Sequence, residues 1–176
     1  NARLPPQEAL EAAARHTAMD DVVIDEQAST VFLRDPALRL DVGAVAKGYA
    51  VEQVCRMAQE EGYTSALISV GGNVRAIGGK GADGSTWNVG VQNPDKGEGA
   101  PDYISIVSVA DQSVVTSGSY ERYYTVDGRR YHHIIDPDTL YPADFYTSLT
   151  IICPDSGKAD ALSTAVFNMP LEEGKA

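Results

Sequence analysis

The sequence predicts an α+β domain in which a mainly antiparallel sheet is flanked by a few helices. Three observations favour this class: short β-branched and apolar runs follow one another along most of the chain, helix-forming segments are few, and turn residues such as Asp127-Gly128 separate neighbouring runs. The chain has 176 residues, a length that suits one domain with a sizeable core. We therefore treat residues 1–176 as a single domain.

Three segments are expected to be helical. Residues 7–16 are rich in Ala, Glu and Leu, residues 49–61 carry apolar side chains at helical spacing before Gly62, and residues 158–169 follow a turn. Between them, the Pro- and Gly-rich segment 92–101 is expected to be a surface loop. Strands are expected at 22–24, 30–33, 66–70, 74–77, 87–91, 104–109, 114–115, 120–126, 131–135 and 148–153.

Composition narrows the classes of partner. The chain has 14 Lys+Arg against 25 Asp+Glu, a formal net charge of −11, so nucleic acid is not an expected partner. An acidic chain can still bind a phosphate ligand when a divalent cation lies between them. Cys55 and Cys153 form no CxxC motif or Cys/His cluster, so we expect two separate thiols and no zinc site. No apolar run reaches the roughly 20 residues that a membrane span needs.

The last helix carries a candidate metal site. Asp160 and Thr164 are four residues apart, so that their oxygens share one helix face beside Ser163. Magnesium prefers such hard oxygen ligands and leaves positions to water and substrate phosphate. The alternative is that Asp160 only caps the helix or favours its dipole.

The segment Leu40–Ala50 is a candidate anion site. Gly43 and Gly48 bracket a turn that opens a helix, where free backbone N–H groups can hold a phosphate, although the segment is neither a Walker A nor a G-x-G-x-x-G sequence. The alternative is an ordinary glycine turn with Lys47 in solvent.

Two of the three histidines, His132 and His133, precede Asp136. Adjacent strand residues point to opposite faces, so we expect one inward histidine that acts as a base or an orienting group rather than two ligands on one ion. The alternative is a strand end whose Asp-Pro pair starts a turn. His16 stands alone on the first helix and is expected to have no site role.

Two strand ends carry small residues that allow a ligand to approach the backbone. They are Gly71-Gly72 and Thr116-Ser117, and either could be only a turn. By themselves these signals indicate a metal-and-phosphate site on an α+β domain, without naming a reaction.

Five segments, in order, resemble the ApbE family of FAD:protein FMN transferases. LDVGAVAKGYA is similar to the family's D-L-G-G-I-A-K-G-Y-A, SVGGNVRAIG to N-V-G-G-D/N-I-R-x-x-G, and VVTSGSYERYY to its TSG-x-Y-x-R segment. YHHIIDPDTLYPA is similar to S/H-H-I-I-D-P-x-T-G-x-P, and ADALSTAVF to A-D-A-L-A/S-T-A. The likeness extends from about residue 20 to residue 170 and implies a T-fold-like domain.

The resemblance implies a reaction and assigns roles. The hydroxyl of a threonine or serine in a target flavoprotein attacks the FAD pyrophosphate with the help of Mg²⁺, FMN becomes linked to the target, and AMP leaves. His133 is our choice for the base. The implied metal residues are Ala44, through its carbonyl, Asp160, Ser163 and Thr164. The implied FAD contacts are Asp41, Lys47, Gly71, Gly72, Thr116, Ser117 and Ile134.

Three departures qualify the resemblance. Leu140 stands where the family has glycine, Lys47 is acidic in some members, and the family's N-terminal portion is missing before Asn1, so we expect a fragment. Two alternatives remain open: an FAD pyrophosphatase that releases FMN and AMP, and a non-catalytic flavin-binding protein. The family implies an extracytoplasmic location, with membrane attachment only through a lipid anchor outside this chain.

Overall fold

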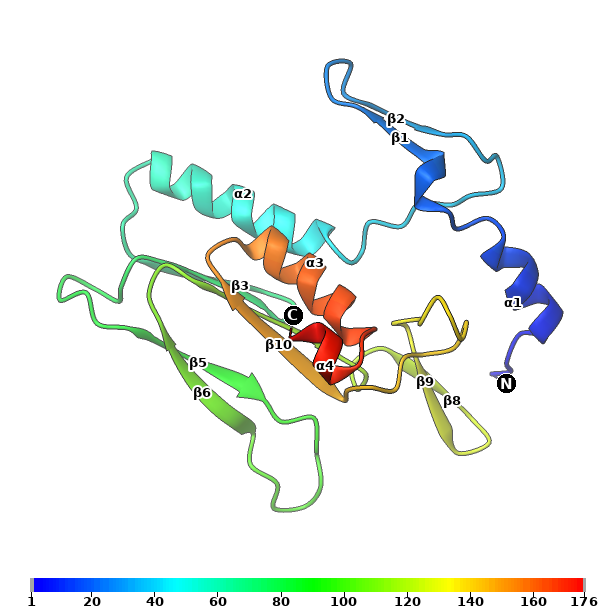
Figure 1. Cartoon of the computed structure of the whole chain (residues 1–176). Helices are drawn as coiled ribbons and strands as arrows, with labels where there is room; N and C mark the ends of the chain where they lie inside the picture. Colours follow the sequence, from blue (N-terminus) through cyan, green and yellow to red (C-terminus); the bar gives the residue numbers. More distant parts are fainter. Residues whose placement is uncertain (1, 176) are drawn as a thin grey trace.

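A four-stranded antiparallel sheet forms the centre of the fold (Figure 1). The computed structural model describes residues 2–175. Each strand pairs with its neighbours in antiparallel register, which confirms the predicted α+β class with a mainly antiparallel sheet. In spatial order the strands are β10 (Ser148–Cys153), β7 (Ser113–Gly118), β4 (Asn73–Ile77) and β3 (Ala66–Val70).

Two helices cover one face of this sheet, α2 (Ala46–Glu60) and α3 (Ser156–Phe167). The core below α2 contains Val51, Cys55 and Ile77, all at most 2% exposed. Below the end of α3, Phe167 is fully buried against Ile134. Cys55 and Cys153 are both free thiols, as predicted.

The hairpin of β5 (Trp87–Gln92) and β6 (Tyr103–Val109) packs against the other face. Successive strand residues point to opposite faces of a sheet. Accordingly, Ile77 of β4 faces α2, whereas Ala76 contacts Val89 and Val109 of the hairpin. The central sheet is therefore covered on both sides.

A second hairpin, β8 (Tyr123–Val126) and β9 (Arg129–His132), extends from the sheet. Its turn is the predicted Asp127-Gly128 pair, with φ values of 49° and 80°. Two consecutive positive φ angles match the type I′ turn that suits a two-residue hairpin loop.

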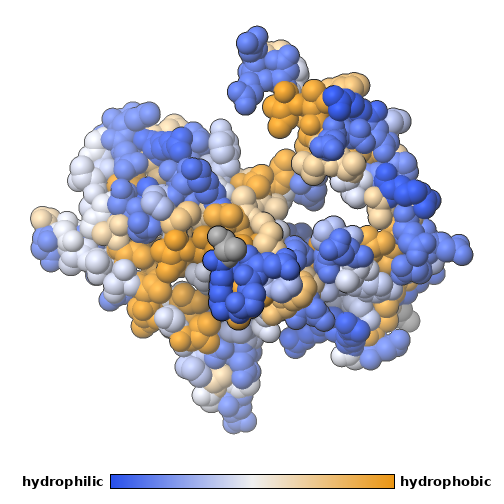
Figure 2. All heavy atoms as spheres, in the orientation of Figure 1, coloured by the Kyte–Doolittle hydropathy of each residue, from blue (hydrophilic) through white to orange (hydrophobic). Residues whose placement is uncertain are grey.

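The N-terminal elements project from this body (Figure 1). Ile24, Val31 and Phe32 on the projecting hairpin are 56–67% exposed, and Figure 2 shows apolar surface there. The N-terminal elements are α1 (Gln7–Ala14), the short 3₁₀ helix η1 (Met19–Asp21), β1 (Val22–Asp25) and β2 (Thr30–Leu33). At the other end of the chain, the short helix α4 (Leu171–Gly174) follows α3.

The structure corrects the predicted boundaries of two helices and two strands. Helix α2 begins at Ala46 rather than at residue 49, which places Lys47 and Gly48 in its first turn. Helix α3 begins at Ser156 rather than at residue 158 because Asp155 caps it by accepting a hydrogen bond from the Lys158 amide. The predicted strands 120–126 and 131–135 shrink and shift to β8 and β9 because pairing is set by the tight turn. Within residues 2–175 no helix has the length and apolar character of a membrane span.

Candidate active site at the junction of two helices and a cleft

Helices α2 and α3 approach each other closely because α2 has a glycine at their contact. A Cβ atom at Gly48 would lie 2.3 Å from the Ser156 carbonyl oxygen and 2.5 Å from Cβ of Asp160. These distances are shorter than any side chain tolerates, so only glycine fits this position. The close approach brings the first turn of α2 to the Asp160 carboxylate.

Both oxygens of Asp160 have partners from α2. Its Oδ1 accepts a hydrogen bond of 2.7 Å from Lys47 Nζ, and its Oδ2 accepts one of 2.7 Å from the backbone N–H of Gly48. Asp160 is 4% exposed and lies in the second turn of α3. The helix cap is Asp155, so the capping half of the alternative for Asp160 is wrong, while the dipole half is not tested. The Gly48 N–H of the predicted anion site is thus taken by the Asp160 carboxylate.

Asn73 lies beside this ion pair and is fully buried. With its amide nitrogen donating to Ser156 Oγ at 2.8 Å, its oxygen faces Lys47 Nζ at 2.9 Å and the Gly48 amide at 3.2 Å. We adopt this orientation because it pairs donors with acceptors at both ends of the amide. Asn73 thereby connects the sheet to both helices at the site.

The two hydroxyls predicted beside Asp160 differ in availability. Ser163 is fully buried, and its Oγ lies 2.7 Å from Ser117 Oγ and 2.9 Å from the Asp160 carbonyl oxygen. Direct ligation by Ser163 would have to break these contacts, so the geometry favours a supporting role. Thr164 Oγ1 is only 3.5 Å from the Asp160 carbonyl, a weak contact that leaves the hydroxyl free for another partner.

Ala44 and Asp41 lie in the turn before α2. Within residues 2–175, no hydrogen bond ends on the Ala44 carbonyl oxygen, and the residue is exposed. Asp41 is exposed, and its Oδ1 accepts a 2.7 Å hydrogen bond from the Gly43 amide. The Asp41 carboxylate thus shapes the turn, while the Ala44 carbonyl is an open oxygen donor.

A cavity of about 700 Å³ lies between the central sheet and the β5–β6 hairpin. Its lining includes Gly71 and Gly72 of the β3–β4 turn and Thr116 of β7. Ser117, the next residue, points instead to α3, where it meets Ser163. The predicted Thr116-Ser117 pair is therefore divided between the cavity and the helix junction, as strand alternation requires.

The two histidines have different surroundings. His132 is the inward one: its Nε2 lies 2.8 Å from the Ala143 carbonyl and its ring meets the Phe167 ring edge-on. His133 is exposed, with Nδ1 3.2 Å from the Arg122 carbonyl. Partial desolvation of the ring lowers the pKa of His133 below its usual 6.5; the hydrogen bond to the Arg122 carbonyl opposes this shift, and the nearby charges of Arg122 and His132 reinforce it. His133 is consequently neutral near pH 7, as a base must be.

The segment after the histidines is a turn. Ile134 is 6% exposed and belongs to the core with Phe167, and Asp136 accepts hydrogen bonds from the Asp138 amide and the Thr139 hydroxyl. Leu140 has φ of 59°. It therefore adopts the left-handed conformation that the family's glycine would adopt without strain.

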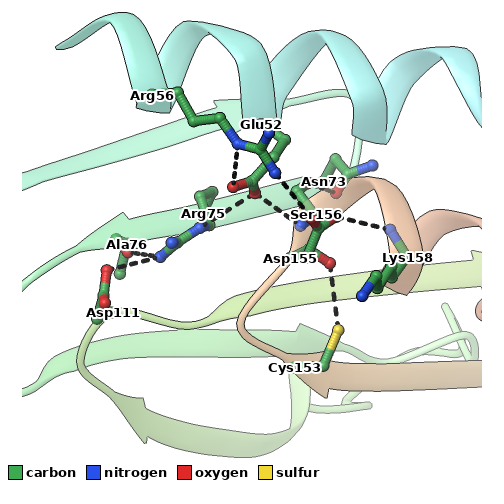
Figure 3. A network of polar contacts seen from close by, with 10 residues as sticks. All are labelled: Glu52, Arg56, Asn73, Arg75, Ala76, Asp111, Cys153, Asp155, Ser156 and Lys158. Atoms are coloured by element: carbon green, nitrogen blue, oxygen red, sulfur yellow. Dashed lines mark hydrogen bonds and ion pairs between the residues drawn. The ribbon is translucent and has the colours of Figure 1, made fainter. Parts of the chain in front are cut away.

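Sequence reasoning missed a buried polar network that supports α3 (Figure 3). Glu52 of α2, 7% exposed, accepts a 2.8 Å hydrogen bond from the Ser156 amide, the first residue of α3, and a 3.4 Å bond from Arg75 of β4. Arg75 also reaches Asp111 at 3.1 Å. The available signal was a pair of opposite charges, Glu52 in the expected helix 49–61 and Arg75 in the expected strand 74–77.

The candidate site offers oxygen atoms of the type that magnesium prefers as ligands. Asp160 supplies a carboxylate, Thr164 a weakly engaged hydroxyl and Ala44 an open carbonyl, all hard oxygens. Across residues 2–175, no three His, Cys, Asp or Glu side chains are grouped to hold an ion by themselves. An ion at Asp160 would therefore need water or substrate phosphate among its ligands, as magnesium commonly has.

Fold and site together define an α+β domain with a carboxylate site at a helix pair beside a cleft. The sequence model of the ApbE family matches residues 1–176, and the chain belongs to that family. It is 39% identical over 159 residues to the FAD:protein FMN transferase of Klebsiella pneumoniae (strain 342), covering 90% of this chain and 48% of that protein.

Two further comparisons agree. The chain is 43% identical over 152 residues to the FAD:protein FMN transferase of Treponema pallidum (strain Nichols), covering 82% of this chain and 41% of that protein. It superimposes on the crystal structure of the ApbE protein of Thermotoga maritima with a TM-score of 0.85 and 41% identity, covering 96% of this chain and 53% of that one. The chain thus spans about half the length of the relatives it matches.

Proposed function

We propose that this chain forms part of an enzyme that transfers FMN from FAD to a threonine or serine of a target flavoprotein in a magnesium-dependent reaction. The observation that carries the proposal is the buried Asp160 carboxylate, which α2 and α3 hold together with Lys47 in a chain of the ApbE family. The names of the relatives support the reaction class.

Asp160, Thr164 and the Ala44 carbonyl would hold the ion. A bound magnesium ion would supply charge neutralisation on the FAD phosphates and polarisation of the phosphorus under attack. Ser163 would hold its helix turn in place through Ser117. The cavity beside Gly71 and Gly72 would accept the flavin part of the substrate, because two residues without side chains let a planar ring approach the backbone.

The remaining chemistry is a displacement at phosphorus. The acceptor hydroxyl oxygen forms a bond to the FMN phosphorus, the bridging P–O bond breaks, and AMP leaves with the bridging oxygen. The hydroxyl proton passes to Nε2 of His133, since Nδ1 faces the Arg122 carbonyl. The lowered pKa of His133 keeps it ready to accept this proton near neutral pH.

The test uses the intact protein, FAD, Mg²⁺ and a flavoprotein subunit that one of the relatives modifies. Mass spectrometry of the subunit should show the addition of one FMN, and chromatography should show one AMP released for each. Asp160→Asn, which keeps the size of the side chain, should abolish both. Free FMN and AMP with an unmodified subunit would replace the transferase by the pyrophosphatase, and FAD recovered intact would reduce the protein to a flavin binder.

A further inference from the structure

Lys47 occupies the position of a cation on Asp160. Its Nζ lies 2.7 Å from Asp160 Oδ1 and 2.9 Å from the oxygen of Asn73. The Asp160 side chain is only 6% exposed, whereas that of Lys47 is 33% exposed. A lysine whose side chain is partly exposed thus places its ammonium against two buried oxygens.

The carboxylate needs this positive charge. A nearly buried anion is costly unless it is paired, and the Gly48 N–H supplies only a partial charge. The Lys47 ammonium completes the pairing. A divalent ion at Asp160 would lie close to that ammonium, and the repulsion between two cations on one carboxylate disfavours their coexistence.

The Lys47 side chain also lies next to Gly71 of the β3–β4 turn. A Cβ atom on Gly71 would lie 3.5 Å from Cδ of Lys47, so the stem passes directly over this glycine. Gly71 lines the 700 Å³ cavity. The Lys47 stem therefore lies against the same β3–β4 turn that borders the cavity, so an ammonium that leaves Asp160 has the rim of the cavity beside it.

We propose that Lys47 is a displaceable internal cation: a divalent ion that binds at Asp160 drives the Lys47 ammonium off the carboxylate and into the cavity, where it meets the anionic substrate. This inference rests on the metal site of the proposed function. It assigns Lys47 two successive partners, Asp160 before the ion binds and a substrate phosphate afterwards. Binding of the ion and of the substrate are then coupled through one side chain.

The first test is a calorimetric titration of the full chain with MgCl₂ in the absence of FAD. Lys47→Met removes the competing charge at nearly constant length and should tighten Mg²⁺ binding about tenfold, which is about 1.4 kcal/mol. Lys158→Met is the matched control, because Lys158 is an exposed lysine of the same helix as Asp160. It removes the same formal charge without a contact to the carboxylate and should change the affinity less than twofold.

Three results would overturn the inference. If Lys47→Met binds Mg²⁺ as tightly as the wild type or more weakly, Lys47 does not compete with the ion. If both variants tighten binding equally, the effect is that of net charge alone. If neither the wild type nor Lys47→Met binds Mg²⁺, the metal site of the proposed function fails, and the inference fails with it.

A second measurement follows the ammonium directly. Acetylation of lysines in the wild-type chain is timed by mass spectrometry with and without Mg²⁺. Release from Asp160 should raise the labelling rate of Lys47 severalfold when Mg²⁺ is present, while the rate at Lys158 stays constant. An unchanged or lower rate at Lys47 under conditions where calorimetry shows bound Mg²⁺ would contradict displacement and leave the metal site intact.

Discussion

The backbone N–H of Gly48 lies 2.7 Å from Oδ2 of Asp160, across 112 residues of sequence. This bond exists because α2 and α3 meet at a residue with no side chain. Replacement of Gly48 by alanine would place Cβ 2.5 Å from Cβ of Asp160 and push the helices apart. We expect Gly48→Ala to lower the free energy of unfolding by about 1–3 kcal/mol and to weaken Mg²⁺ binding. Urea denaturation and calorimetry measure the two effects.

Gly157→Ala is the matched control at the same helix pair. A Cβ there would lie 3.2 Å from Oδ1 of Asp155 and 3.5 Å from Cα of Tyr49, contacts that small movements can relieve. Since alanine is the better helix former by about 1 kcal/mol, stability should be unchanged or higher. Equal losses in Gly48→Ala and Gly157→Ala would contradict the role given to Gly48.

Glu52 should be essential to the stability of the helix pair. Glu52→Ala removes the acceptor for the Ser156 amide and leaves Arg75 buried without its α2 partner. Breaking a buried ion pair from one side costs about 3–5 kcal/mol. The free energy of unfolding from a urea titration should fall by that amount.

Arg56→Gln tests whether burial of the Glu52–Arg75 pair causes the loss of stability expected for Glu52→Ala. Arg56 also contacts Glu52, at 3.4 Å, but its side chain is 53% exposed. Exposed pairs contribute about 0–1 kcal/mol. A loss in Arg56→Gln as large as that in Glu52→Ala would show that the buried network does not carry the stability.

Leu140 is predicted to be a strained residue. A left-handed conformation costs an ordinary residue about 1–2 kcal/mol, and glycine avoids this cost. Leu140→Gly should therefore keep or raise the free energy of unfolding, even though glycine adds freedom to the unfolded chain. Leu162→Gly, in the exposed face of α3, should instead lose about 1 kcal/mol. Similar losses at both positions would contradict the strain.

Protonation of His133 at acidic pH should slow the transfer reaction. Desolvation lowers its pKa below 6.5 in the folded chain, so the neutral base prevails at pH 7. The transfer rate should rise with pH below 6.5 and be level above it, and His133→Gln should remove this step.

The same shift has a consequence for stability. The unfolded chain binds the His133 proton more readily than the folded chain, so the His133 contribution to stability is lost as the pH falls below 6.5. NMR titration of the imidazole gives the pKa, and a value above 6.5 would contradict the environment described for His133.

Local patterns were sufficient to predict most of the fold. Apolar spacing predicted α2, the turn before residue 158 predicted α3, and the Asp127-Gly128 pair predicted the β8–β9 turn. The start of α2 was misplaced because Gly48 was read as part of a turn. Gly48 instead lies inside α2, where it packs against Ser156, a tertiary contact that no local pattern reveals.

The site was predicted only in outline. The four-residue spacing of Asp160 and Thr164 placed both on one helix face, but spacing alone did not reveal that Lys47 and Asn73 surround the carboxylate. Those contacts join segments far apart in the sequence and depend on how α2 and α3 dock. Glu52 was missed for the same reason, because its partner Ser156 lies 104 residues away.

The most direct test of the account is a calorimetric titration of Mg²⁺ into the wild-type chain and Asp160→Asn. The amide keeps an oxygen for the Gly48 N–H and so preserves the helix junction while it removes the charge. The account predicts a saturable Mg²⁺ isotherm for the wild type and an affinity at least about 100-fold weaker, a loss of about 2.7 kcal/mol, for Asp160→Asn. Equal affinities in two chains with the same circular dichroism spectrum would contradict it.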